Sequence, residues 1–370
     1  MAKLSYNELK GAVASLVTVA KISNASFVET RDNIVGLLDK IGKIVTLDTD
    51  YQIDKLNMFD GEYLSFGKTI EEWQQDLILI EDKDPSGSGA LAPHNPTYRP
   101  VFYSYTLGEK TIPTTIRNNN IERAVHFEEQ FVSIVAMQYK RLEDSMAVYR
   151  YQVKREMLAK LIDLCETAMS SSSDSYATTT AYSVGKYLKN STDRGIVVKA
   201  IANTNTKTWA EALADGLIIK LDLLCDIDKP VDDTTGEAFI KQVKADVERA
   251  TDLNEGNSLN GNSLGATEGL VLILKQGIMP SLQVDTIAGA FQKEELAFPV
   301  EVVVVKDFGN ADSKYFGILM DRRGARLHNT YNATRENVNG QGDFLNIFRH
   351  TEDTAYLSRN TFVKVYGELS

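Results

Sequence analysis

The sequence predicts a mixed α+β fold, and three observations support this prediction. Aromatic and β-branched residues alternate with other residues between Thr97 and Ile116, as in a strand. The stretch from Ile121 to Met169 has neither proline nor glycine and carries apolar residues at helical spacing. The apolar runs LVLIL (Leu270 to Leu274) and VEVVVV (Val300 to Val305) are typical of buried strands. Such strands with a helix between them indicate a compact α/β lobe.

Length, charge and cysteine content narrow the class of protein. The 370 residues are enough for one large or two modest domains. The formal net charge of −11 argues against a protein that grips nucleic acid electrostatically, because phosphate binding needs clustered Lys and Arg. Cys165 and Cys225 lie far apart and match no disulfide or metal spacing. Without a disulfide framework, we expect a reducing compartment. No apolar run approaches the about 18 residues that span a bilayer, so we expect a cytoplasmic protein.

The N-terminal region is predicted to be a helical arm that becomes extended. Ser26 and Glu29 have the spacing of a capping box. Ile34, Leu37, Leu38 and Ile41 then recur at helical spacing up to Gly42. The periodicity fails from Thr46 to Gln52, as in an extended segment.

A long hairpin follows this arm. The polar, turn-rich stretch from Glu81 to Pro96 forms its expected tip. Pro100 and Pro113 confine the strand after the tip to an edge or a protruding position. For Ile70 to Ile80 the pattern alone predicts a helix, since Thr69-x-x-Glu72 is itself a capping-box match.

The proline-free stretch predicts one very long helix. Forty residues of helix are about 60 Å long, more than the diameter of a small domain. The helix is therefore expected to cross the molecule or to pack on neighbours. A coiled coil is the alternative, but the apolar stripe drifts too much for a strict heptad. The serine run from Ser170 to Ser175 is expected to end the helix.

The second half is predicted to alternate helices and strands. Thr208 and Glu211 cap a helix with leucines on one face, and a second helix follows around Phe239 to Val247. The leucines of the first helix are Leu213, Leu217, Leu221 and Leu224. The sequence GNSL occurs twice, at Gly256 and Gly261, and is expected to be loop. Further predicted elements are a helix over Val284 to Phe291, a strand KYFGILMD ending at Asp321, and a last strand TFVKVY near Val365.

One motif suggests a nucleotide-binding P-loop, because Gly67 begins Gly-Lys-Thr. The P-loop pattern G-x-x-x-x-G-K-[ST] lets backbone N–H groups curl round a phosphate that the lysine reaches. Here Gly61 is followed by five residues before Gly67, which is one too many, and Glu62 occupies the required glycine position. The preceding DKLNMFD is too polar for a buried strand, and Lys306 interrupts the apolar strand–Asp pattern at VEVVVVKD. These departures make nucleotide binding the less favoured interpretation.

No other catalytic, cofactor-binding or metal site is predicted. His94, His126, His328 and His350 are scattered without zinc-binding spacing. Glu71 and Glu72 are adjacent, so in a strand they would lie on opposite faces and are poor candidates for a catalytic pair. The basic cluster Arg322, Arg323 and Arg326 is interpreted as a strand-end turn that makes salt bridges within or between subunits.

The order of these elements resembles the major capsid protein of tailed bacteriophages (the Johnson fold), particularly its short-tailed, podovirus-type branch. The resemblance covers most of the chain. It is carried by G-[KR]-T-I-E-E at Gly67 to Glu72, by D-[KR]-I-G at Asp39 to Gly42, and by V-D-x-[IL]-A-x-A-F at Val284 to Phe291. A valine strand with D-x-F-like residues at Asp307 and Phe308 adds to it. Each motif alone is weak, but their shared order is more specific.

The resemblance implies a division of the chain into five regions. These are an N-terminal arm (1–60), an extension loop that is a β-hairpin (61–117), a peripheral domain with the spine helix (118–175), an axial domain (176–321) and strands returning to the peripheral domain (322–370). The segment Ile70 to Ile80 is then extended rather than helical, and we expect the extended form.

The resemblance also implies a non-enzymatic function without a cofactor. The chain is expected to self-assemble into the icosahedral shell of a virion, built in the host cytoplasm around a double-stranded DNA genome. Expected partners are the chain itself in hexamers and pentamers, a scaffolding protein, a portal, and decoration or head-fibre proteins, with no membrane and no sequence-specific DNA binding. Isolated hairpins are marginally stable, so their aromatic residues are expected to be buried against neighbouring subunits. The candidate subunit contacts are Lys68, Trp73, Phe102, Tyr103, Tyr105, Arg322 and Arg323.

Two alternatives remain at this stage. An encapsulin-like compartment shell would have the same fold but would carry a cargo protein, and neighbouring genes would separate the two. A P-loop ATPase would lose nucleotide turnover in a Lys68→Ala variant.

Overall fold

The computed structural model describes residues 54–65, 67, 69–75, 98–103, 106–117, 128–170, 174–176, 181–201, 206–263, 265–266, 269–281 and 298–369. Three expectations lie outside these residues: the N-terminal arm up to residue 53, the tip of the hairpin, and the helix over Val284 to Phe291.

The chain divides into two compact units. The first comprises Met1–Ser65, Thr106–Arg155 and His328–Asp353, and the second comprises Phe66–Tyr105, Glu156–Leu327 and Thr354–Ser370. The five-region division expected from the sequence stays a prediction.

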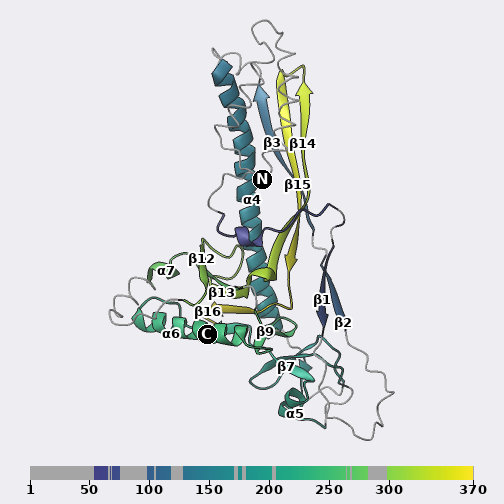
Figure 1. Cartoon of the computed structure of the whole chain (residues 1–370), viewed down its shortest axis with the longest axis vertical. Coiled ribbons are helices and arrows are strands. Elements are labelled where there is room, and N and C mark those ends of the chain that lie inside the picture. Colours follow the sequence, from purple (N-terminus) through teal and green to yellow (C-terminus); the bar gives the residue numbers. More distant parts are fainter. Residues whose placement is uncertain are drawn as a thin grey trace. The chain divides into compact units, whose positions relative to one another are not determined.

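The first unit contains a three-stranded sheet and most of a long helix. The strands are β3 (Thr106–Arg117), β14 (Ala325–Asn339) and β15 (Phe344–Leu357), in the order β14-β15-β3. The first part of α4 (Glu128–Ser170) runs alongside them (Figure 1). Pro113 lies in β3, which is an edge strand of this sheet, because proline cannot donate to a sheet ladder. Leu142 and Met146 of α4 are buried, as are Leu345 and Ile347 of β15.

The long helix is confirmed over 43 residues, and it ends at the first serine of the serine run. Its last turns bury one face, since the buried residues recur at the three- and four-residue spacing of a helix. These residues are Met157, Leu158, Leu161, Ile162, Cys165 and Ala168.

The second unit is built on a mixed five-stranded sheet, in the order β12-β11-β13-β16-β8 (Figure 1). Its strands are β8 (Leu224–Asp226), β11 (Leu270–Lys275), β12 (Glu301–Val305), β13 (Tyr315–Asp321) and β16 (Val363–Gly367). Phe239 of α6 (Asp233–Thr251) packs edge to face against Phe316 and Tyr366 of the sheet. The short helix α7 (Ile278–Ser281) follows β11. Both strands predicted from the apolar runs are confirmed, but only β11 is buried throughout its apolar residues, whereas β12 is a partly buried edge strand. The predicted helix α6 is confirmed as well.

A smaller four-stranded sheet lies in the same unit, in the order β4-β5-β6-β7. Its strands are β4 (Asp174–Ser175), β5 (Tyr187–Lys189), β6 (Arg194–Val197) and β7 (Ile218–Lys220). Tyr176, Tyr182 and Trp209 pack together beside it, with the two tyrosine rings stacked at 5.8 Å between centroids.

The helix capped by Thr208 is confirmed, but it is shorter than the leucine spacing predicts. The capping box with Glu211 is present, and α5 (Trp209–Ala214) stops two residues before Gly216. Gly216 has a φ of 60°, a left-handed conformation that ends helices. The later leucines therefore belong to the chain around β7 and β8, not to the helix.

One further expectation is corrected. The two GNSL copies are not loop: they form β9 (Gly256–Ser258) and β10 (Gly261–Ser263), which pair with each other antiparallel. The predicted last strand is confirmed as β16, which pairs antiparallel with β13 and parallel with β8. All of its residues are buried, as in a central strand.

Candidate functional site

The extended hairpin is present, and its register is defined. β1 (Ile70–Gln75) pairs antiparallel with β2 (Tyr98–Tyr103) in a sheet of two strands. The extended conformation expected for Ile70 to Ile80 is thus confirmed as far as Gln75, and the remaining residues lie outside the described part. The helical pattern was misleading here, because pairing with β2 satisfies the backbone of β1 and overrides local propensity.

The register sorts the hairpin residues into two faces. Directly paired residues share a face, and successive residues of a strand alternate between faces. One face carries the pairs Glu71–Phe102, Trp73–Pro100 and Gln75–Tyr98. The other carries Ile70–Tyr103, Glu72–Val101 and Gln74–Arg99. Of the predicted contact residues, Trp73 and Phe102 therefore share a face, Tyr103 lies on the opposite one, and Lys68 and Tyr105 are outside the described residues.

At its root, the hairpin is joined to its own unit by side-chain contacts that the sequence analysis missed. The Ser358 hydroxyl donates to Glu72 Oε1 over 2.6 Å. Tyr356 lies beside this contact, and burial together with the Glu72 carboxylate raises its pKa to about 12. No sequence signal links residues 286 positions apart, so only the structure reveals this contact.

The two predicted arginines make ion pairs within the subunit. Asp321 is buried at the end of β13 and caps the 3-10 turn η3 (Arg322–Gly324). Arg323 Nη2 lies 2.9 Å from Asp321 Oδ2, and Arg322 pairs with Glu301. This is the strand-end turn that the sequence predicts. Contact of either arginine with a neighbouring subunit stays a prediction.

The segment before the hairpin is held against the first unit by buried charge. Leu56 and Phe59 of this segment are fully buried; Leu56 precedes the 3-10 turn η1 (Asn57–Phe59), and Phe59 is its last residue. Lys154 of α4 has a side chain that is 1% exposed, with Nζ 2.5 Å from Asp54 Oδ2 and 2.8 Å from Asp60 Oδ1. A buried lysine of this kind is stable only when it is paired, so these aspartates position the segment on α4.

Gly61 and Gly67, the two glycines of the P-loop-like pattern, have structural rather than nucleotide-binding roles. A Cβ on Gly61 would lie 2.5 Å from His328 Nδ1, so only glycine fits there. The same Nδ1 donates to the Glu62 carbonyl over 2.9 Å. Gly67 has a φ of 77°, a left-handed conformation that favours glycine just before the hairpin.

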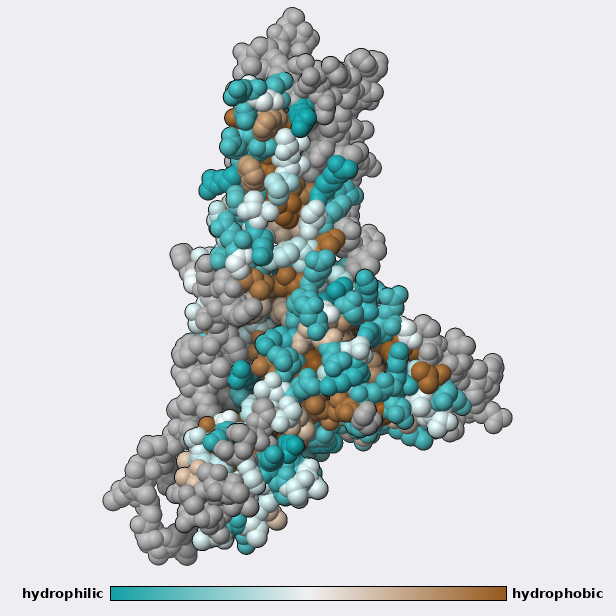
Figure 2. All heavy atoms as spheres, turned by 180° about the vertical axis from the view of Figure 1, so that it is seen from behind, coloured by the Kyte–Doolittle hydropathy of each residue, from teal (hydrophilic) through white to brown (hydrophobic). Residues whose placement is uncertain are grey.

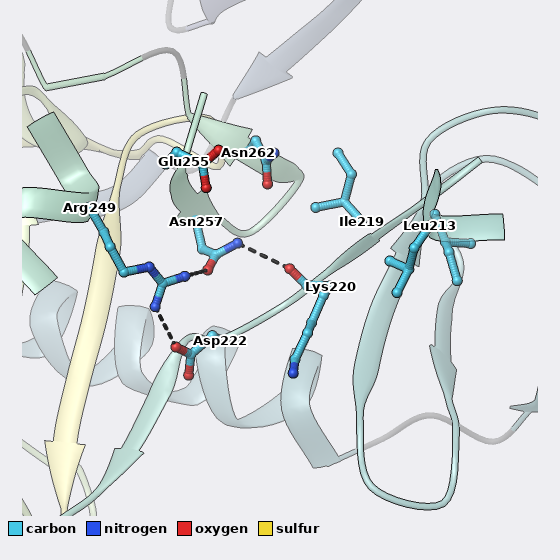
Figure 3. Close-up of a pocket in the computed structure, with 9 residues that line it drawn as sticks. Leu213, Ile219, Lys220, Asp222, Arg249, Glu255, Asn257 and Asn262 are labelled. Atoms are coloured by element: carbon cyan, nitrogen blue, oxygen red, sulfur yellow. Dashed lines mark hydrogen bonds and ion pairs between the residues drawn. The ribbon is translucent and has the colours of Figure 1, made fainter. Parts of the chain in front are cut away.

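A cavity of about 390 Å³ lies beside β7, α6 and the β9–β10 hairpin (Figure 3). Two of its charged groups pair with each other: Arg249 Nη1 donates to Asp222 Oδ2 over 2.9 Å, and Arg249 Nη2 donates to Asn257 Oδ1 over 3.2 Å. Asn257 in turn donates to the Lys220 carbonyl over 3.1 Å. Because these groups neutralise one another and no histidine or cysteine lines the cavity, we assign no chemistry to it.

The described residues include no group of three or more His, Cys, Asp and Glu side chains placed to hold a metal ion. None of the described helices is both long and apolar enough to cross a membrane. Hydrophobic residues form small groups among hydrophilic ones on the face in Figure 2. The large exposed hydrophobic residues described are Tyr63, Val148, Val184, Val231, Leu253 and Val338.

The fold is that of phage capsid proteins. A chain of the capsid of Staphylococcus phage Andhra superposes with a TM-score of 0.54 at 10% identity, over 87% of this chain and 84% of the other. A chain in the structure of the head fibre and inner core protein of native bacteriophage P68 gives a TM-score of 0.52 at 13% identity, over 87% of both chains. No curated protein matches the sequence.

The sequence itself defines the family. Residues 5–363 match the family of Phi29-like phage major capsid proteins, and the chain belongs to this family. It is thus a phage major capsid protein, a structural component of the virion shell that assembles from many copies. The resemblance seen in the sequence is confirmed.

Proposed function

We propose that the chain forms an icosahedral shell of hexamers and pentamers around a double-stranded DNA genome. The observation that carries this proposal is the family match over residues 5–363. The partners proposed for this shell are a scaffolding protein, a portal, and decoration or head-fibre proteins. Catalysis plays no part in this function.

The hairpin is the element that we assign to contacts between subunits. A two-stranded sheet alone is marginally stable in water and gains stability when it packs against another surface. Interfaces favour aromatic residues, and β1 and β2 contain Trp73, Phe102 and Tyr103. Lys68 and Tyr105 flank these strands in sequence, and Arg322 and Arg323 form a second, charged contact. Repetition of modest contacts round a closed symmetric shell gives a stable particle without a tight pairwise affinity.

Expression with and without a scaffolding protein, followed by electron microscopy and sedimentation, tests the proposal. We expect closed or tubular particles of megadalton mass. A subunit that stays monomeric at high concentration, with the scaffold present and the fold intact by circular dichroism, would contradict the proposal. The symmetry of the particles then distinguishes hexamers and pentamers from other arrangements. The family match disfavours both the encapsulin-like compartment and the P-loop ATPase.

A further inference from the structure

The chain contains two Asn-Gly sequences, and both lie where a turn joins paired strands. Asn339–Gly340 begins the turn from β14 to β15, and Asn260–Gly261 ends the turn from β9 to β10. A backbone nitrogen reaches the preceding carboxamide most easily when it belongs to glycine, which has no Cβ in the way. The two turns hold the asparagine side chain differently, so they should differ in reactivity.

The turn after Asn339 is open to solvent and polarises the carboxamide. Residues 339–343 are all exposed. The Gly342 N–H donates to Asn339 Oδ1 over 2.8 Å. A donor on this oxygen makes Cγ more electrophilic, because it stabilises the negative charge that develops on Oδ1 when a nucleophile attacks. A Cβ added to Gly340 would meet no non-neighbouring atom within 4 Å, so the space beside Gly340 is open.

The turn at Asn260 holds its reacting groups in place. Asn260 Nδ2 donates to Asn360 Oδ1 over 2.7 Å, and the Asn260 backbone N–H donates to the Arg359 carbonyl over 3.0 Å. Donation from Nδ2 tethers the side chain and increases the electron density on this nitrogen, which makes it a poorer leaving group. Gly261 is buried, and a Cβ there would lie 3.0 Å from Ile219 Cδ1. The fold therefore protects this Asn-Gly sequence.

We propose that Asn339 is a site of spontaneous deamidation, with the Gly340 backbone nitrogen as nucleophile and water as co-reactant. The Gly340 nitrogen bonds to Asn339 Cγ, which closes a five-membered succinimide ring. The Cγ–Nδ2 bond breaks, and Nδ2 leaves as ammonia with the proton of the Gly340 N–H. Water then opens the ring at Cγ to give aspartate, or at the backbone carbonyl carbon to give isoaspartate.

The modification changes the charge and, in part of the product, the backbone. A modified subunit gains a negative charge at the tip of the β14–β15 hairpin, on a chain whose formal net charge is already −11. Isoaspartate also adds an atom to the main chain of the turn. This inference concerns the chemistry of the single subunit and goes beyond the proposed function.

Peptide mapping by mass spectrometry after incubation of the full chain in mildly alkaline buffer tests the proposal. Deamidation raises the mass of a peptide by about one dalton, and an isoaspartyl methyltransferase labels the isoaspartate product. Digestion at mildly acidic pH limits further reaction during the analysis. We expect product at Asn339 but not at Asn260 in the folded subunit. In guanidinium chloride, where both turns are unfolded, the two asparagines should react at similar rates.

Gly340→Ala is the matched variant for the nucleophile. Gly340 is outside the left-handed region of φ and has room for a methyl group, so alanine fits the turn. The variant keeps the Asn339 side chain and its bond to the Gly342 N–H. We expect the reaction at Asn339 to slow about tenfold, because the methyl group hinders approach of the nitrogen to Cγ. The rate at Asn260 in guanidinium chloride should be unchanged.

Absence of product at Asn339, or equal rates at Asn339 and Asn260 in the folded subunit, would overturn the proposal. A Gly340→Ala variant that reacts as fast as the parent would show that the Gly340 nitrogen is not the nucleophile. If this variant fails to fold, the comparison of the two asparagines in the folded parent decides the proposal. All of these measurements use the unassembled subunit, so they are independent of whether a shell forms.

Discussion

At the residue scale, Lys364 is a charged side chain on a buried strand. It lies on β16 with a side chain that is 4% exposed, and its Nζ is 2.6 Å from Asp222 Oδ1. Burial by itself raises the pKa of Asp222, but the charges of Lys364 and Arg249 outweigh it and hold that pKa below its ordinary value. The ionised carboxylate is therefore favoured more strongly in the folded than in the unfolded chain.

This pair predicts a pH-dependent loss of stability in Asp222→Asn. The lowered pKa of Asp222 contributes stability that is fully present above the ordinary carboxyl value of 3.8 and is lost as the pH falls through the folded value. We expect the variant to lose about 1–2 kcal/mol of unfolding free energy at neutral pH, since Asp222 is partly solvated and screened. Urea unfolding across the acidic range should show this difference vanish below the folded pKa.

The control for this prediction is Asp163→Asn, which removes a carboxylate from a fully surface ion pair. Asp163 pairs with Lys160 on α4, and both side chains are more than half exposed. Its loss should cost no more than about 0.5 kcal/mol. An equal cost in the two variants would mean that burial of Lys364 contributes nothing.

At the element scale, Asp54, Asp60 and Lys154 determine where the segment before the hairpin is attached. Lys154 is buried, whereas Asp54 and Asp60 are 24% and 40% exposed. Removing both acids leaves a buried charge without a partner, while removing the lysine leaves two carboxylates that water can reach. The two changes should therefore differ in cost, although both break the two ion pairs of Lys154.

We predict that Asp54→Asn/Asp60→Asn lowers the unfolding free energy by about 3 kcal/mol, as for a broken buried ion pair. The triple variant with Lys154→Met should recover most of this loss, because methionine fills the space without a charge. Urea unfolding of the unassembled subunit measures both. A triple variant no more stable than the double one would show that the unpaired charge of Lys154 does not cause the loss of stability.

Elements with long, regular patterns could be predicted from the sequence, and the short ones could not. The helix α4 repeats its apolar spacing over many turns, so a few polar lapses do not hide it. The strands β5, β6 and β7 have three or four residues each and carry no period. The leucines after α5 keep a helical spacing by chance, and only the conformation of Gly216 ends the helix.

The candidate site was predictable only in part, for a related reason. Aromatic residues in a hairpin indicate a contact surface, but sorting them into faces requires the register of β1 on β2. The Glu72–Ser358 bond joins two distant segments, and composition cannot reveal such a contact. The first glycine of the P-loop-like pattern also depends on a contact between distant segments. His328 approaches Gly61 so closely that only glycine fits there.

At the scale of the whole molecule, the fold is kept although the sequences differ widely. The chain shares 10% and 13% identity with the two phage structures, yet the superposition covers 87% of it in both cases. A shell function depends on shape and on many distributed contacts rather than on a few reacting groups. Substitutions that keep the packing and the contact faces are therefore tolerated at most positions.

Net charge is the other property that belongs to the whole molecule. The chain carries 51 acidic and 40 basic residues. Several cationic side chains in the described part form ion pairs with carboxylates of the same subunit. They include Lys154, Arg249, Lys314, Arg349 and Lys364. We infer that the subunit surface repels phosphates on balance and lets enclosed DNA slide past it.

The resulting prediction is weak DNA binding that depends little on salt. Neutralising six to ten phosphates changes affinity by about 10³–10⁵-fold between about 50 and 200 mM salt. For this chain we expect a change on the order of tenfold or less, as for at most about two phosphate contacts. Fluorescence anisotropy of a short labelled duplex across that range measures it, and a basic DNA-binding protein serves as the control. A DNA affinity that falls steeply with salt would indicate a basic inner face. It would contradict the inference that enclosed DNA slides past the subunit surface.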